Sequence, residues 1–140
     1  MTKRYYVNDC LIVPIKTIND IRGNLGVIEY CQNIPFVPRR FYFIYGVPSI
    51  TTRGAHAHRE LMQVIVAIQG SVDVQLYDGV KLANYTLKDP SQGLYIAPGI
   101  WREILFTCSD TICLVAASKE YDESDYIRDM DLFETMVNNT

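Results

Sequence analysis

The segment RGAHAHRELMQVIVAIQG, residues 53–70, is the part of the chain that decides the expected fold. His56 and His58 stand two positions apart, and on a β-strand such residues point to the same face, so both imidazoles are expected to enter one cavity. Gln63 comes five positions after His58, and Gly70 closes the segment. The apolar run at 61–68 predicts a strand that follows the histidines directly.

This spacing resembles the first motif of the cupins, in which two histidines and a glutamate bind a metal. The segment PGIWR, residues 98–102, is similar to the second cupin motif up to its last residue, where the family places a fourth ligand, a histidine. Here Gln63 takes the place of the glutamate and Arg102 takes the place of that histidine. The chain has two histidines in all, so no other histidine replaces the missing ligand.

The charges at these two positions argue against a metal. Divalent ions in proteins prefer imidazole and carboxylate donors, whereas Gln63 offers a neutral amide oxygen. Arg102 has no lone pair to donate and stays cationic. At ~5 Å from a dication and an effective dielectric constant of about 20, a guanidinium repels the ion by roughly 6–7 kcal/mol. We therefore expect a cupin-shaped pocket without metal or other cofactor, whose histidines serve proton chemistry.

Length and composition predict one globular domain over residues 1–140. The chain is 49% hydrophobic and 21% charged, and its net charge of −3 without a basic cluster gives no reason to expect nucleic acid as a partner. The four cysteines lack a disulfide-framework spacing, which favours free thiols in a reducing cytoplasm. No apolar run approaches the ~20 residues of a membrane span. We expect a soluble, cytoplasmic protein.

Short strand-like runs separated by turn residues predict an all-β fold, a jelly-roll sandwich or barrel of the cupin type. Asp78-Gly79 is a strong hairpin signal and Gln69-Gly70 a weaker one, while NDIRGNLG (19–26) is expected to form a loop. Apolar residues near helical spacing at 123–137 predict a C-terminal helix packed on the sandwich, with Ser124 as its N-cap. The expected strands cover 11–15, 26–30, 40–46, 61–68, 71–77, 80–87, 93–98, 101–106 and 111–118.

Other polar residues are candidates for the same pocket. Arg40 and Tyr42 form a second pair two positions apart: the arginine is suited to binding a phosphate and the phenol to orienting a substrate oxygen, unless this aromatic run is core. Arg22 and Arg53 are further anion binders or simply solvated charges. Trp101, the one tryptophan, either stacks on a base or sugar or wedges the mouth of the barrel.

Four longer segments resemble, in order, the nucleotide-sugar 3,4-ketoisomerases of the cupin superfamily. They are NIPFVPRRFYFIYG (33–46), TRGAHAHRELMQVIVAIQGSV (52–72), DPSQGLYIAPGIWREI (89–104) and AASKEYDESDYIRDMDLF (116–133). The resemblance implies a metal-free homodimer that acts on dTDP-4-keto-6-deoxyglucose in bacterial surface-polysaccharide and O-antigen (lipopolysaccharide) biosynthesis. It also implies that the ketone moves from C4 to C3 through an enediol, and that a pyridoxal-phosphate aminotransferase acts next.

By the same resemblance, the catalytic residues of the family fall on His56, His58 and Tyr42. We expect His56 to take the C3 proton, while His58 and Tyr42 handle the oxygen protons. The resemblance places the diphosphate among arginines, first Arg40 and Arg53. The other expected substrate-binding residues are Gln63, Arg22, Trp101 and Arg102.

Two questions stay open from the sequence. Arg22 and Arg102 stand where members of the family differ from one another, so both a galacto- and a gluco-configured product remain possible. A non-catalytic cupin that binds sugar nucleotides, or a metal-dependent cupin oxygenase, is an alternative to the isomerase. Metal analysis separates the oxygenase from the other two, and turnover of the keto sugar separates the isomerase from the binding protein.

Overall fold

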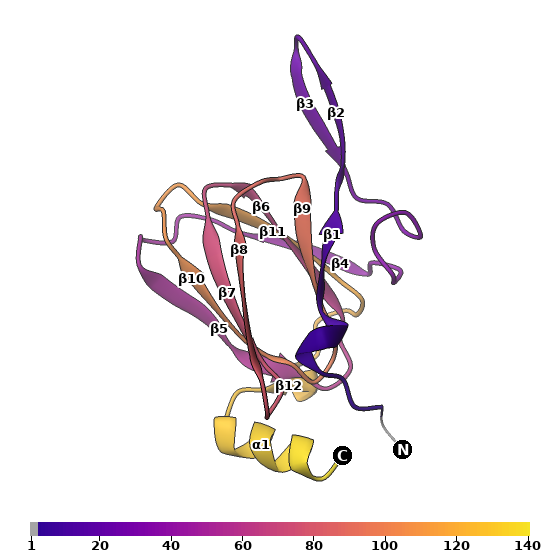
Figure 1. Ribbon diagram of the computed structural model, residues 1–140, viewed down its shortest axis with the longest axis vertical. Helices are drawn as coiled ribbons and strands as arrows, with labels where there is room; N and C mark the ends of the chain where they lie inside the picture. The colour runs from indigo at the N-terminus through magenta and orange to yellow at the C-terminus, as the bar shows by residue number, and fades with distance from the viewer. Residues whose placement is uncertain (1–2) are drawn as a thin grey trace.

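Two five-stranded antiparallel sheets form the body of the computed structural model, which describes residues 3–140 (Figure 1). Residues 1 and 2 of the expected domain lie outside the described residues. The first sheet has the order β1-β9-β6-β11-β4, comprising Leu11–Pro14, Gln92–Ile96, Gln63–Gln69, Ile112–Ala117 and Arg40–Ile44. The second has the order β12-β5-β10-β7-β8, comprising Tyr126–Ile127, Thr51–His58, Trp101–Phe106, Val72–Tyr77 and Leu82–Leu87. The expected all-β sandwich of the cupin type is confirmed.

The main core lies between the two sheets and follows from the alternating pattern of the strands. In β7, Val72, Val74 and Leu76 are buried while the residues between them face outward. The opposite sheet contributes Ile65, Leu94 and Val115 to the same cluster. Burying such side chains contributes roughly 1.5–3 kcal/mol each. The sandwich thereby holds its two inner faces in fixed register, and this positions the polar residues at one end.

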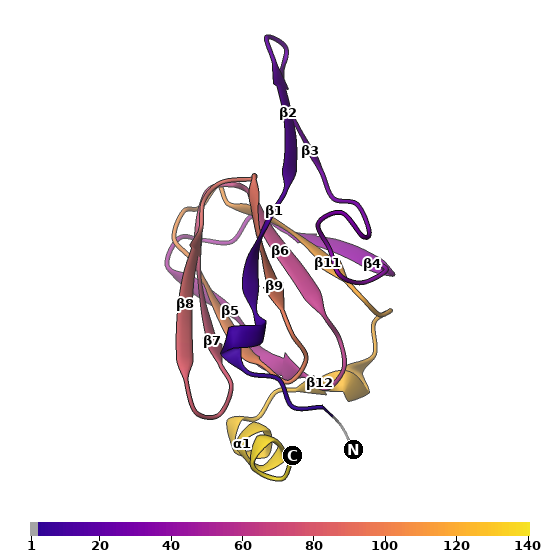
Figure 2. The same ribbon diagram turned by 45° about the vertical axis from the view of Figure 1, so that its right-hand side comes forward.

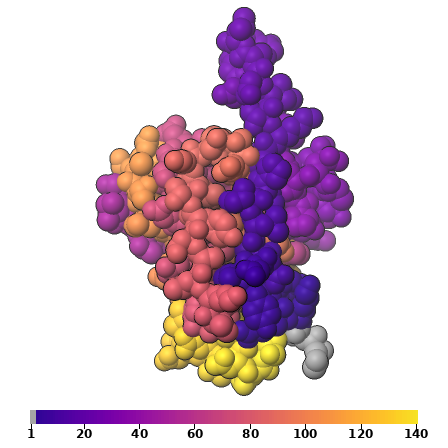
Figure 3. Space-filling model, viewed as in Figure 1, coloured from indigo at the N-terminus to yellow at the C-terminus, as the bar shows by residue number. Residues whose placement is uncertain are grey.

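A two-stranded arm, β2 (Lys16–Asp20) and β3 (Gly23–Val27), projects from the sandwich (Figures 1 and 3). The prediction of a loop at 19–26 was therefore wrong, and so was the strand at 26–30, because β3 ends at Val27. The two strands are exposed along almost their whole length. The hairpin is closed by a two-residue turn, in which Ile21 is fully exposed and Arg22 pairs with Asp20 at 2.7 Å.

The hairpin expected at Asp78-Gly79 is confirmed and joins β7 to β8. The Asp78 carboxylate accepts hydrogen bonds from the backbone amides of Val80 and Lys81 inside the turn, and from that of Val7. Gln69-Gly70, in contrast, connects β6 to β7, which belong to different sheets, so it makes no hairpin. Gly70 has a φ of +76°, and a Cβ there would overlap the side chain of Thr111, which explains the glycine.

The C-terminal segment differs from the expected helix over 123–137. It forms a 3-10 turn (η2, Glu123–Asp125), the short strand β12 and then the helix α1 (Met130–Asn138) (Figure 2). Pairing of β12 with β5 interrupts the helix, and Asp129 rather than Ser124 caps α1 by accepting a bond from the amide of Leu132 at 2.9 Å. No helix within residues 3–140 has the length and apolar character needed to cross a bilayer.

Candidate active site

A cavity of about 530 Å³ opens between the two sheets, a volume in the usual range for a small-molecule site. Tyr42 reaches it from β4 in one sheet, and His56 reaches it from β5 in the other. Its polar lining comprises Arg40, Tyr42, Tyr45, Arg53, His56, Gln63, Arg102, Tyr121, Tyr126 and Arg128. Arg40 and Tyr42 therefore line the cavity together, as expected from their spacing.

A bulge in β5 brings Arg53 to the same cavity as His56. Three positions separate these residues, so a regular strand would direct them to opposite faces. Gly54 between them has a φ of +88°, and the pairing of β5 with β10 shifts there, from Arg102 opposite His56 to Ile104 opposite Arg53. The extra residue of the bulge thus restores Arg53 to the cavity side.

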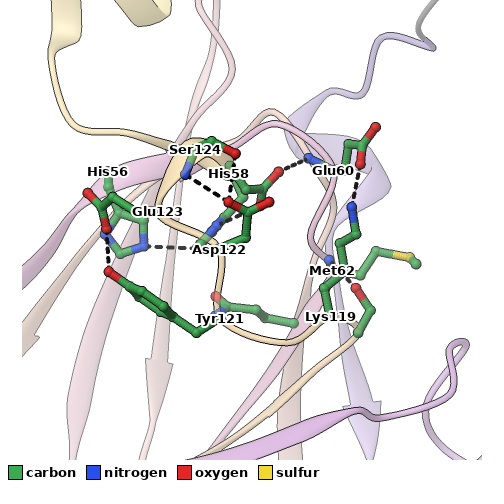
Figure 4. A network of polar contacts seen from close by, with 12 residues as sticks. His56, His58, Glu60, Met62, Lys119, Tyr121, Asp122, Glu123 and Ser124 are labelled. Carbon is green, nitrogen blue, oxygen red and sulfur yellow. Dashed lines mark hydrogen bonds and ion pairs between the residues drawn. The ribbon is translucent and has the colours of Figure 1, made fainter.

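The two histidines contact each other directly, but they occupy different environments. The Nε2 atoms of His56 and His58 lie 3.1 Å apart, and Figure 4 shows both rings beside the segment that carries Tyr121 and Glu123. His56 lines the cavity, whereas His58 is completely buried behind it. The Nδ1 atom of His58 lies 3.1 Å from Oδ2 of Asp125. The expectation that both imidazoles enter one cavity is therefore met by His56 but not by His58, which lies behind it.

Both imidazoles are held in the neutral form. Burial, reinforced by the positive charge of Arg102, lowers the pKa of His56 to about 3. Burial, and after it the positive charge of Arg102, also lowers the pKa of His58, to about 2. A neutral imidazole keeps a lone pair and can accept a proton near pH 7, which a protonated one cannot.

A second chain of hydrogen bonds runs from Arg102 through Gln63 to Tyr42. Arg102 donates from Nη1 to Oε1 of Gln63 at 2.5 Å, and Gln63 donates from Nε2 to the Tyr42 hydroxyl at 2.9 Å. Because arginine has donors only, it fixes which end of the amide faces the tyrosine. The Tyr42 oxygen is thereby an acceptor within the protein, and its own proton is free for a ligand. Burial raises the pKa of Tyr42, so the hydroxyl stays protonated.

The four positions that correspond to cupin metal ligands do not fit a metal ion. Gln63 and Arg102 are hydrogen-bonded to each other, so the amide oxygen is occupied by a guanidinium. Arg102 is completely buried, and although burial lowers its pKa to about 10, it remains cationic at neutral pH. Within residues 3–140 no three His, Cys, Asp or Glu side chains are grouped as a metal would require.

The cavity carries an excess of positive charge that is only partly neutralised. Nε and Nη2 of Arg40 are buried and have no hydrogen-bond partner among the described residues. Arg53 lines the same cavity, whereas Arg128 on the rim pairs with Glu123 at 2.8 Å. Buried donors without an acceptor are costly, so this arrangement favours an anionic ligand that supplies the missing acceptors.

Two of the expected substrate-binding residues lie elsewhere. Trp101 is buried and is not among the cavity residues; its ring stacks on Phe133 of α1 at a centroid distance of 5.7 Å, which gives it a packing role in this chain. Arg22 lies at the tip of the arm and is not among the cavity residues of its own chain. The sequence places Trp101 next to the cavity residue Arg102, and nothing in that neighbourhood indicates that α1 covers the tryptophan.

The sequence reasoning also missed the contribution of the C-terminal segment. The rings of Tyr126 and His58 lie 4.3 Å apart by centroids, and those of Tyr126 and His56 lie 5.1 Å apart. Asp125 holds His58, and Arg128 lies over the Tyr126 ring at 4.3 Å. The density of charged and aromatic residues in KEYDESDYIRD (119–129) is the available signal, but the helical spacing of apolar residues at 123–137 predicts a packed helix rather than a wall of the site.

Comparison with known proteins identifies the class. The family described as "FdtA: WxcM-like, C-terminal" matches residues 8–138. TDP-4-oxo-6-deoxy-α-D-glucose-3,4-oxoisomerase of Aneurinibacillus thermoaerophilus is 42% identical over 126 residues, 90% of this chain and 91% of the relative. The chain belongs to the sugar 3,4-ketoisomerases. This confirms the resemblance drawn from the four sequence segments, and it makes the chain an enzyme.

Solved structures of sugar 3,4-ketoisomerases share the fold closely. QdtA from Thermoanaerobacterium thermosaccharolyticum, solved in complex with TDP, is 38% identical with a TM-score of 0.89, covering 93% of this chain and 95% of QdtA. A 3,4-ketoisomerase from Helicobacter canadensis is 41% identical with a TM-score of 0.89, covering 93% and 98% of the two chains.

Proposed function

We propose that this ketoisomerase converts dTDP-4-keto-6-deoxyglucose into a dTDP-3-keto-6-deoxyhexose. The name of the Aneurinibacillus relative specifies this keto sugar, and a histidine-to-asparagine variant of the Thermoanaerobacterium enzyme was solved with TDP-4-keto-6-deoxyglucose. The observation that carries the proposal for this chain is that neutral His56 and protonated Tyr42 face one cavity from opposite sheets. A base and an acid are the two groups that a keto–enediol isomerisation requires.

The reaction follows from the acidity that the C4 ketone gives to the C3–H bond. His56 takes the C3 proton, and the electrons of that bond form the enediolate, whose oxygen at C4 accepts a hydrogen bond from Tyr42. Because Arg102 and Gln63 orient Tyr42, this donor needs no reorganisation as charge develops on the oxygen. His56 then returns a proton to C4, and the proton of the C3 hydroxyl passes to the oxygen at C4, which leaves a hydroxyl at C4 and a ketone at C3. Every step is a proton transfer, so the reaction requires no oxidant.

The arginines of the cavity are suited to the diphosphate of the nucleotide. Arg40 holds unpaired buried donors, and Arg53 reaches the same side through the Gly54 bulge. Arginine binds phosphate through two parallel hydrogen bonds, which gives orientation as well as affinity. Gln63 and Arg102 also line the cavity, but they are hydrogen-bonded to each other and to Tyr42, so we assign them the positioning of Tyr42 rather than primary contacts with the diphosphate.

We infer that the enzyme works as a homodimer in which the arm packs on a second copy. An isolated hairpin is marginally stable in water, and this arm exposes Ile18 and Leu25 along its length in addition to Ile21 at the tip. A partner that covers these side chains would stabilise the arm, and it would give Arg22 a route to the partner's cavity. We also propose that the enzyme is cytoplasmic and acts in O-antigen synthesis. A pyridoxal-phosphate aminotransferase would use its 3-keto product next.

The test is incubation of the purified protein with dTDP-4-keto-6-deoxyglucose, followed by proton NMR. We expect signals of a 3-keto sugar, whose coupling constants report the C4 configuration. His56→Asn should reduce turnover on the order of 10²–10⁴-fold while leaving dTDP affinity nearly unchanged. Tight binding of the keto sugar to the wild-type protein without any conversion would instead support the non-catalytic binding protein.

A further inference from the structure

Three polar contacts in series connect the cavity to the C-terminal segment. His56 contacts His58 through their Nε2 atoms, and Nδ1 of His58 contacts Oδ2 of Asp125, both at 3.1 Å. The second carboxylate oxygen of Asp125 accepts a bond from the backbone amide of Glu60 at 2.8 Å. Asp125 is 67 positions from His58 in sequence and immediately precedes β12, which pairs with β5 beside His58. The series is therefore built by tertiary contacts and held by backbone pairing.

The direction of each hydrogen bond follows from the end of the series. A carboxylate offers acceptors only, so His58 must donate to Asp125 and carry its proton on Nδ1. In a neutral ring the other nitrogen, Nε2, is then an acceptor, and His56 must donate to it from its own Nε2. Nδ1 of His56 is left with a lone pair, and it has no hydrogen bond to any described residue. Both rings are neutral at neutral pH, as the depressed pKa values require.

We propose that Asp125 is a positioning residue that sets the tautomer of both histidines and makes Nδ1 of His56 the atom that accepts the substrate proton. The inference rests on the proposed function for the identity of that proton, but the tautomers themselves do not depend on it. Sequence reasoning assigned no role to Asp125, and His58 becomes a second positioning residue because it is completely buried behind His56.

The same series gives the proton a place to move. When Nδ1 of His56 takes the C3 proton, the bonding electrons remain on the sugar and His56 becomes an imidazolium. Its Nε2 proton can then pass to Nε2 of His58, which leaves His56 neutral again and places the positive charge on His58, next to the Asp125 carboxylate. Reversal of that transfer returns the proton for delivery at C4. The net charge and the number of protons are unchanged over the cycle.

The substitution Asp125→Asn is expected to exchange donor and acceptor in both hydrogen bonds of the series, the one to His58 and the one between the two histidines. The amide of Glu60 requires an acceptor, so the oxygen of the introduced carboxamide turns toward it and the NH₂ group faces Nδ1 of His58. His58 must then accept on Nδ1 and carry its proton on Nε2, which it donates to Nε2 of His56. His56 is left with its proton on Nδ1, where the base is needed. The exchange of one carboxylate oxygen for an NH₂ group thus removes the free lone pair from Nδ1 of His56 without removing either histidine.

The experiment is nitrogen-15 NMR of histidine-labelled protein at neutral pH, in which the two rings of this chain are readily assigned through His56→Asn and His58→Asn. In the wild type we expect His58 with the proton on Nδ1 and His56 with the proton on Nε2. In Asp125→Asn we expect both assignments to be exchanged. C3–H exchange in D₂O, measured on the keto sugar, should fall on the order of 10²–10⁴-fold while dTDP affinity stays within about twofold.

The matched control is Asp73→Asn, which removes the same charge from an exposed position on β7 where the carboxylate accepts a bond from the Thr86 hydroxyl. It should leave the tautomers and the exchange rate unchanged. A wild-type His58 with its proton on Nε2 would overturn the proposal, and so would an Asp125→Asn protein with unchanged tautomers and full exchange. The wild-type spectrum decides the question even if Asp125→Asn does not fold. Correct tautomers in a protein without isomerase activity would refute the proposed function alone.

Discussion

The neutral, partly buried state of His56 makes the stability of the protein depend on pH in a way that His56→Asn should reveal. The folded-state pKa is lowered to about 3, whereas an unfolded chain has a histidine pKa of about 6.5. Between these values the unfolded state binds a proton that the folded state excludes, so stability is lost as the pH falls below about 6.5. From pH 8 to pH 5 this loss amounts to about 2 kcal/mol for one histidine.

The assay is urea unfolding of wild type and His56→Asn at pH 8 and pH 5, at one fixed protein concentration. Titrating groups that do not contact His56 remain in both proteins and cancel in the difference. His58 contacts His56, but burial and the charge of Arg102 are the larger causes of its lowered pKa and remain in the variant, so the difference reports mainly on His56. We expect the stability difference to shift by about 2 kcal/mol in favour of the variant at pH 5. A difference that is the same at both pH values would refute a neutral, desolvated His56, and with it the base that the proposed reaction requires.

Four further outcomes are expected. Tyr42→Phe should slow turnover on the order of 10²–10³-fold, measured by NMR, because the enediolate oxygen loses its donor, while dTDP affinity should be retained. Arg40→Ala should weaken dTDP binding by roughly 10–100-fold in calorimetry, since charge-assisted bonds to phosphate contribute about 1.5–3 kcal/mol. Activity should survive dialysis against EDTA and should not rise with zinc or iron; stoichiometric metal whose removal abolishes activity would contradict the reasoning from Arg102. Light scattering at micromolar concentration should give about twice the chain mass of 16.0 kDa, and Leu25→Asp should lower it if the arm forms the interface.

The sequence by itself determined the features that depend on neighbouring residues. The alternation of apolar and polar residues predicted the strands, because each strand must direct one face to the core. The same period placed Arg40 with Tyr42 on a shared face, and both line the cavity as expected. It also placed His56 beside His58, and their rings are in contact, but His58 is buried behind the cavity that His56 lines. The replacement of two cupin ligand positions by Gln63 and Arg102 was also readable, since it depends on residue type alone. The family resemblance followed from these local motifs.

Other features of the site were decided only by contacts between distant segments. The role of Asp125 depends on its meeting His58, and the burial of Trp101 depends on α1 packing over β10, neither of which any local pattern encodes. The arm was missed because its exposed strands carry no alternation toward a core of their own chain. The C-terminal residues have helical spacing, yet Tyr126 and Ile127 pair with β5 as a short strand. For these two residues, pairing and packing on the sheet stabilise the chain more than another turn of helix would. Local pattern specifies which face of an element is buried, and tertiary structure decides what that face meets.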